Sequence, residues 1–256
     1  MKRFKDAGFL TPVILLFSIA LLASCSVEKE PEWRSLFNGE NLDGWDIKIS
    51  GFKLNDNHRN TFRAEEGLLV VSYDEYDAFD NKFGHIFFNE PFSHYKLRVE
   101  YRFVGEQVEG GAGWAYRNNG IMFHSQSAES MELDQDFPVS VEAQLLGGDG
   151  ENERPNFNVC TPGTHVEIDG VLRTEHCINS TGRTFHGDQW VTVDLHVFGD
   201  SIVYHIIEND TVMTYSNMIL SDTGEPLKEG YIALQAESHP THFRRIEIMD
   251  LGDQYK

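Results

Sequence analysis

The sequence predicts an all-β protein, a sandwich or jelly roll of two antiparallel sheets. Alternation of apolar and polar residues with a period of two dominates the chain, which is typical of half-buried strands. The chain also carries 22 glycines and 12% aromatic residues, a composition that favours strands and turns. No stretch of 12 or more residues shows a clear 3.6-residue apolar period, and no repeat recurs at a fixed spacing. These patterns argue against helical, propeller and solenoid folds.

The first 24 residues have the pattern of a bacterial signal peptide. A basic start precedes an apolar run of 15 residues (9–23), which is shorter than the roughly 20 residues of a transmembrane helix. The run ends in LLASC, which resembles a lipobox with Cys25 as the lipidated residue. An ordinary secretory signal with an incidental cysteine is the alternative. We therefore expect a lipoprotein signal peptide at 1–24, a tether at 25–32 and a single jelly-roll domain at 33–256.

The expected lipid anchor also predicts a location. Ser26 follows the cysteine, so the aspartate that usually signals inner-membrane retention is absent. We expect a lipid-anchored protein of the cell envelope, at the outer membrane, on either its periplasmic or its surface face. A multiply acylated cysteine would make the membrane a stable partner.

Composition and charge narrow the possible partners. Lys and Arg total 21 against 41 Asp and Glu, a formal charge of −20. Such a chain repels the phosphates of nucleic acids, so a nucleic-acid partner is not expected. Neither GxGxxG nor GxxxxGK[ST] occurs in the sequence, so no nucleotide fingerprint is present. The oligomeric state stays open.

The strands can be placed by their alternation. Residues 95–103 alternate almost ideally, with Tyr95, Leu97, Val99, Tyr101 and Phe103 on one face. Residues 191–197 alternate in the same way, and the Gly199-Asp200 turn joins them to 201–207 as a hairpin. Further strands are expected at 118–126, 138–148, 211–216, 230–238 and 243–251.

A long segment, 147–180, lacks alternation and is rich in Gly, Pro, Asn and Thr. We interpret it as a loop excursion, because loops of this length in compact domains are usually functional or disordered. Cys160 and Cys177 lie within it. In an exported protein two remaining cysteines most economically form a disulfide. A thiolate nucleophile or a zinc site is the alternative, although no CxxC spacing supports it.

Polar residues on three expected strands fall in the same alternation phase. Glu142 and Gln144 are expected to project from the outer face of one strand, His124 from a second, and Gln235 and Glu237 from a third. Each alone is most simply a solvated or packed residue. Their convergence near Trp114, Tyr116 and Arg117 instead predicts a polar groove with aromatic planes, which suits sugar recognition.

The eleven histidines show neither HxH nor HExxH spacing, so no metal ligand is assigned. A divalent cation such as calcium, held by carboxylates and carbonyls, stays open as an alternative.

Several segments together resemble the 3-keto-disaccharide hydrolase family, formerly a domain of unknown function and abundant among bacterial lipoproteins. They are SLFNGENLDGWDI, KLRVEYRF, NNGIMFH, SVEAQLLGG and the closing GYIALQAESHPTHFRRIEIMDL. The resemblance runs from Trp33 to Leu251. It implies a concanavalin A-like jelly roll. The chain departs from the common family pattern in carrying RPNFNVCTPGT and EHCINS as an insertion, and in having GIMFH where many members have an arginine.

The resemblance implies cleavage of 3-keto-glycosides without a required cofactor. A ketone at C3, made by a separate oxidoreductase, acidifies the C2 proton. A base removes that proton, the C1 aglycone leaves by β-elimination, and water adds to the product. This chemistry needs a base, a donor to the enolate oxygen and an acid for the leaving group.

Specific roles follow from the strand phases. His124 is the expected base, because imidazole titrates near neutral pH, and Glu142 orients it or acts as the acid. The expected substrate-binding residues are Trp114, Arg117, Asn119, Gln144, Gln235, Glu237 and His239. Two other functions remain possible from sequence, a non-catalytic lectin-like protein and a conventional hydrolase using Glu142 and Glu237.

Overall fold

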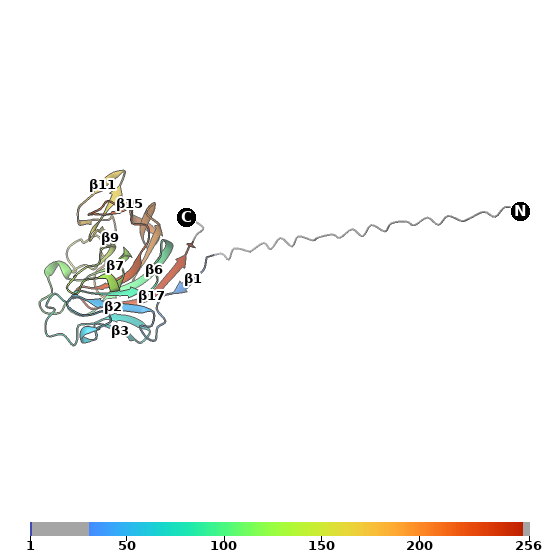
Figure 1. Ribbon diagram of the computed structural model, residues 1–256. Coiled ribbons are helices and arrows are strands. Elements are labelled where there is room, and N and C mark those ends of the chain that lie inside the picture. Colours follow the sequence, from blue (N-terminus) through green and yellow to red (C-terminus); the bar gives the residue numbers. More distant parts are fainter. Residues whose placement is uncertain (2–30, 253–256) are drawn as a thin grey trace. The chain divides into compact units, whose positions relative to one another are not determined.

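Period-two alternation produces two antiparallel sheets in the computed structural model, which describes Met1 and residues 31–252 (Figure 1). The expected signal peptide, Cys25 and most of the tether lie outside the described residues. From Pro31 onward the chain clusters as one compact unit. The prediction of an all-β protein with two antiparallel sheets is confirmed.

The larger sheet has ten strands in the order β11-β10-β15-β14-β13-β6-β17-β4-β3, with β1 added beside β17. Their bounds are β1 Trp33–Ser35, β3 Phe62–Glu65, β4 Leu68–Val71, β6 His94–Phe103, β10 Thr164–Ile168, β11 Val171–Arg173, β13 Val191–Phe198, β14 Ile202–Ile207, β15 Asp210–Leu220 and β17 Thr241–Asp250. Hairpins join β13 to β14, as the Gly199-Asp200 turn predicted, and β14 to β15.

The smaller sheet carries the candidate site. Its seven strands run in the order β12-β9-β8-β7-β16-β5-β2. Their bounds are β2 Trp45–Ile49, β5 Gly84–Phe88, β7 Asn118–Ser125, β8 Val141–Leu146, β9 Asn158–Cys160, β12 Cys177–Ile178 and β16 Tyr231–Ala236. Three single-turn 3-10 helices complete the described elements, η1 His58–Asn60, η2 Gly113–Ala115 and η3 Ala128–Ser130.

The core lies between the two sheets. On β6 every second residue from Tyr95 to Phe103 is buried, as the sequence predicted. The smaller sheet adds the alternate residues of β8 and β16, including Val141, Ala143 and Leu234, to the same cluster. Because one face of each of these strands enters the core, the opposite face of the smaller sheet is free to carry polar side chains.

Segment 147–180 differs from the expected loop excursion. It contains β9, β10, β11 and β12, two of which extend the smaller sheet and two the larger. The short strands escaped prediction because each spans only two to five residues, too few for alternation to register.

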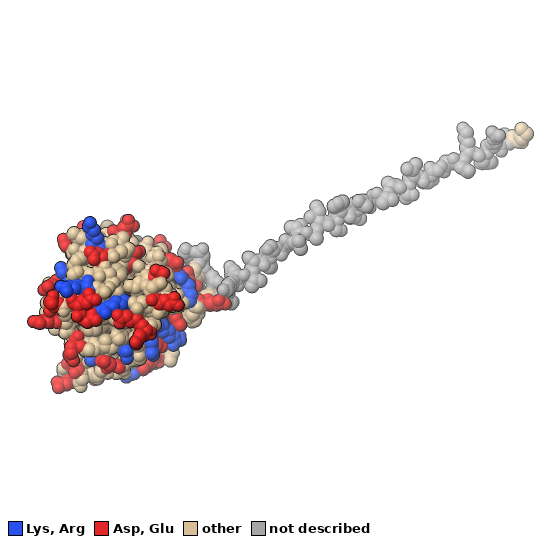
Figure 2. Space-filling view, turned by 90° about the horizontal axis from the view of Figure 1, so that it is seen from below, with Lys and Arg blue, Asp and Glu red and all other residues tan. Residues whose placement is uncertain are grey.

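The surface carries mixed charge. Figure 2 shows acidic side chains spread over the visible face, with basic ones interspersed among them. Among the described residues no helix is long and apolar enough to cross a membrane.

Candidate active site

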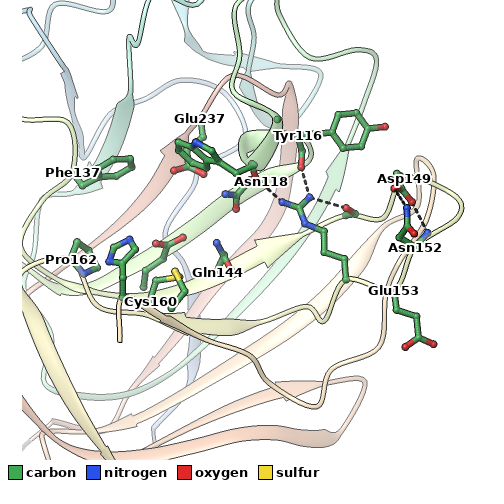
Figure 3. A pocket seen from close by; sticks show the side chains of 17 residues that line it. Tyr116, Asn118, Phe137, Gln144, Asp149, Asn152, Glu153, Cys160, Pro162 and Glu237 are labelled. Carbon is green, nitrogen blue, oxygen red and sulfur yellow. Dashed lines mark hydrogen bonds between the residues drawn. A yellow bond between two sulfur atoms is a disulfide. The ribbon is translucent and has the colours of Figure 1, made fainter. Parts of the chain in front are cut away.

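A cavity of about 690 Å³ opens on the outer face of the smaller sheet. Its floor comes from β7 and β8, and its walls come from η2, from the loop after β8 and from the β9–β12 edge. Figure 3 shows the side chains Asn118, Gln144 and Glu237 between Phe137 on one side and Asp149 on the other.

Strand alternation on β8 places Glu142 at this cavity. Val141, Ala143 and Leu145 enter the core, so Glu142 and Gln144 project from the outer face. Gly120 of β7 is the cross-strand partner of Gln144. A Cβ atom at Gly120 would lie 2.4 Å from Glu142 Oε1. The Glu142 carboxyl therefore lies over the β7 backbone, in space that only a glycine leaves open.

Glu142 and Glu237 form a buried pair of carboxyls. Glu237 follows β16 in the outward phase of that strand and is 3% exposed, while Glu142 is 6% exposed. Burial raises the pKa of Glu142 to about 8. Burial and the charge of Glu142 raise the pKa of Glu237 as well, against the opposing effect of Arg154. The pair therefore holds at least one proton at neutral pH.

Each carboxyl has one oxygen that can still accept a hydrogen bond from a ligand. Glu142 Oε1 and Glu237 Oε2 are buried and have no hydrogen-bond partner within the described chain. The same is true of Asn118 Oδ1, which also borders the cavity. Buried polar atoms are normally paired, so these atoms are available to bind a molecule in the cavity.

Arg154 ties two walls of the cavity together. Its guanidinium donates to the carbonyls of Trp114 (2.8 Å), Gly147 (3.1 Å) and Tyr116. These bonds connect the η2 segment to the end of β8. Burial lowers the pKa of Arg154, but a guanidinium remains a cation at neutral pH.

Aromatic rings form one end of the cavity. Trp114 is 55% exposed and stacks on Phe83 with ring centroids 6.0 Å apart. Phe83 in turn contacts Phe137 at 4.9 Å. The exposed indole offers a flat apolar surface beside carboxyl and amide groups, the combination that binds sugar rings.

The predicted Cys160–Cys177 disulfide is confirmed. It joins β9 to β12, where the two cysteines are direct cross-strand partners. Both cysteines and the neighbouring His176 border the cavity. The crosslink therefore holds one wall in place.

The expected orientation of His124 is wrong. Phe123 and His124 of β7 lie opposite the single residue Ile232 of β16, and this two-against-one pairing is a β-bulge. His124 has a φ of 45°. A bulge reverses the side to which the next side chain points. His124 is 1% exposed, and its Nε2 lies 3.1 Å from the carbonyl oxygen of Gly199, in the turn between β13 and β14. Burial lowers its pKa to about 4, and it does not border the cavity.

Asn119 and Arg117 also lie elsewhere than expected. Asn119 shares the inward phase of Ile121, and its Nδ2 donates to the Gln235 carbonyl at 2.7 Å. Arg117 lies 3.5 Å from Asp188. Neither side chain borders the cavity, so the amide that does so on this strand is that of Asn118.

His239 and Gln235 are buried beside the cavity without bordering it. His239 packs between the rings of Phe103 and Tyr116, at 5.6 and 5.2 Å. Burial, together with two nearby arginines, lowers its pKa to about 4. Gln235 is paired across the strands with His85 and is 0% exposed. Their expected contact with substrate is not supported by this placement.

Four of the nine predicted site residues do meet at the cavity: Trp114, Glu142, Gln144 and Glu237. The prediction missed Asn118, Phe137, Asp149, Asn152, Glu153, Arg154 and His176. Asn118 could have been found, because it shares the outward phase of Gly120. The other six lie in loops, where no periodic signal exists.

Residues 31–252 gather no group of three or more His, Cys, Asp or Glu side chains that could hold a metal ion.

Comparison with protein families matches residues 32–249 to the model of the 3-keto-alpha-glucoside-1,2-lyase-like domain. The match covers most of the chain and confirms, at the family level, the resemblance seen in the sequence. Comparison with curated proteins gave no significant match.

Solved structures share the fold at low sequence identity. A Parabacteroides distasonis protein provisionally named a glycosyl hydrolase is 16% identical, with a TM-score of 0.52 over 86% of this chain and 100% of that one. A structure from gut bacteria that express endo-acting O-glycanases to initiate mucin breakdown is 14% identical, with a TM-score of 0.52 over 86% and 99%. The exoplasmic/lumenal domain of VIP36, bound to Ca²⁺ and Man3GlcNAc, is 10% identical, with a TM-score of 0.52 over 89% and 93%. These likenesses confirm the concanavalin A-like fold.

Proposed function

The chain belongs to the 3-keto-alpha-glucoside-1,2-lyase-like family, and we propose that it cleaves 3-keto-glycosides by β-elimination. The observation that carries the proposal is the buried Glu142–Glu237 pair at the cavity. An elimination needs one group that takes a proton and another that gives one, and a pair holding a single proton supplies both.

In the proposed reaction the sugar loses its C2–H and C1–O bonds and gains a C1–C2 double bond, while one proton moves to the base and another moves from the acid to the leaving oxygen. The ionised carboxyl of the pair removes the C2 proton of the 3-keto sugar, and the electron pair forms the C1–C2 double bond. The C1–O bond breaks, and the protonated carboxyl gives its proton to the departing oxygen. Water then adds across the new double bond to give the free 3-keto sugar. The ketone is already in the substrate, so no redox cofactor is needed.

Amide groups on the floor stabilise the developing enolate. Gln144 and Asn118 border the cavity beside the carboxyl pair, and their N–H groups can donate to the C3 oxygen. Positioned donors of this kind act without reorganisation, because strands hold them rigidly.

The aromatic end binds the sugar ring. Trp114 has one face against Phe83 and more than half its surface exposed. A sugar stacked there would lie beside the carboxyl pair, which also borders the cavity.

A matched pair of substrates tests the proposal. The purified domain is incubated with an aryl glucoside and with its 3-keto derivative, and aglycone release is followed by absorbance. We expect release from the keto compound alone. Release from both compounds would instead support a conventional two-carboxylate hydrolase, and binding of either without release would support a lectin-like protein.

A further inference from the structure

The end of the cavity away from Phe137 is acidic. Figure 3 shows Asp149, Asn152 and Glu153 on this side. They belong to the loop after β8, which continues into β9. The floor of the same cavity carries Glu142, Glu237 and Asn118, each 6% exposed or less and each with a buried oxygen that has no partner within the described chain.

The carboxylate of Asp149 is held ionised. It accepts hydrogen bonds from the backbone N–H groups of Glu151 (2.9 Å) and Asn152 (2.8 Å), and from Asn152 Nδ2 (2.7 Å). These donors lower the pKa of Asp149. Glu153 is exposed, and its carboxylate has neither a hydrogen bond nor an ion pair within residues 31–252. Both side chains therefore contribute negative charge at this end.

The positive charge that borders the cavity is already engaged by backbone carbonyls. Arg154 is the sole Lys or Arg among the lining residues of the described chain. Both terminal nitrogens of its guanidinium already donate to backbone carbonyls, at Trp114, Tyr116 and Gly147. An anionic group at Arg154 would have to compete with these carbonyls and with the nearby carboxyls of Glu237 and Asp149, whose charges already act on the guanidinium.

We propose that this acidic end is the subsite for the departing aglycone, and that it selects neutral or positively charged aglycones against negatively charged ones. The inference rests on the proposed function, with the 3-keto sugar at the aromatic end. Glu237 of the carboxyl pair lies between Phe137 and Asp149 (Figure 3), and the bond to the aglycone would break at this pair. The subsite would thus determine which aglycone charge the enzyme accepts.

The expected selectivity follows from Coulomb's law. The interaction of two unit charges about 4 Å apart in water changes an equilibrium or rate constant roughly fivefold. The change is larger where solvent is partly excluded. An aglycone charge near two carboxylates should therefore change kcat/KM by about tenfold or more. Salt should weaken the effect, because the acidic end is open to solvent.

The test uses three 3-keto-glucosides of similar size. Their phenyl aglycones carry a para carboxymethyl, carbamoylmethyl or aminoethyl group, and the carbon spacer keeps the acidity of the leaving phenol nearly constant. We expect kcat/KM to rank the amine and the amide well above the carboxylate at low salt. The amide-to-carboxylate ratio should shrink as salt is raised.

Two variants locate the effect. Glu153→Gln removes one carboxylate at the acidic end and should raise kcat/KM for the carboxylate substrate severalfold relative to the amide. Glu151→Gln is the control, because Glu151 belongs to the same loop but does not border the cavity. It should leave the amide-to-carboxylate ratio of kcat/KM near that of the wild type.

Equal kcat/KM for all three substrates, or an equal response to the two variants, would overturn the inference. Because the amide substrate is neutral, its cleavage reports on the proposed function separately. Failure to cleave any 3-keto-glucoside would reject the proposed function itself.

Discussion

At the scale of single residues, the carboxyl pair makes a kinetic prediction. Glu142→Gln or Glu237→Gln removes either the base or the acid, and each should lower kcat on a 3-keto-glycoside by about 10²-fold or more. Circular dichroism should show an unchanged fold, because glutamine has the same shape as glutamate. Near-native rates in both variants would show that the reaction does not use this pair.

The same pair makes a prediction about stability. The pKa of Glu142 is raised to about 8 in the folded state, against about 4.3 for a free glutamate. The folded protein therefore binds more protons than the unfolded chain between these values, and the free energy of unfolding falls as pH rises through this window. Glu142→Gln should flatten the fall in melting temperature between about pH 5 and 8. An identical pH profile in wild type and variant would contradict the raised pKa.

At the scale of elements, the disulfide between β9 and β12 makes a prediction about the cavity wall. A crosslink that closes a loop of this length contributes about 3 kcal/mol by chain entropy. Reduction, or the Cys160→Ala/Cys177→Ala double variant, should lower the melting temperature and raise KM, because His176 and the neighbouring wall lose their anchor. The double variant itself supplies the control, since reductant should then have no further effect. An unchanged KM after reduction would show that this wall does not contact substrate.

The sequence predicts site residues well on regular strands and poorly at bulges and in loops. Glu142 and Gln144 were found because alternation persists along β8. His124 was misplaced because alternation fails at the bulge on β7, and a bulge leaves no periodic signature in sequence. Arg154 was missed because it lies in a loop, and two of its partners, the carbonyls of Tyr116 and Trp114, are 38 and 40 positions away in the chain. The two-sheet fold could be predicted since its long strands repeat the same pattern many times.

At the scale of the whole molecule, the N-terminal segment makes a prediction about location. We propose that Cys25 is lipidated and holds the protein at the outer membrane, an inference from the sequence alone, since the residue lies outside the described part of the chain. Cys25→Ser should move the protein from the membrane fraction to the soluble fraction or leave it unprocessed. Equal recovery of both forms in the soluble fraction would count against an anchor.

The exposed indole at the cavity gives the protein a built-in optical probe. The chain has four tryptophans. Trp45 is buried, whereas Trp114 is the one exposed tryptophan of the four and borders the cavity. A sugar ring stacked on Trp114 would replace water at its open face and alter its fluorescence. Emission can therefore report ligand occupancy directly in a variant with strongly slowed turnover, such as Glu142→Gln, and Trp114→Phe would remove the signal.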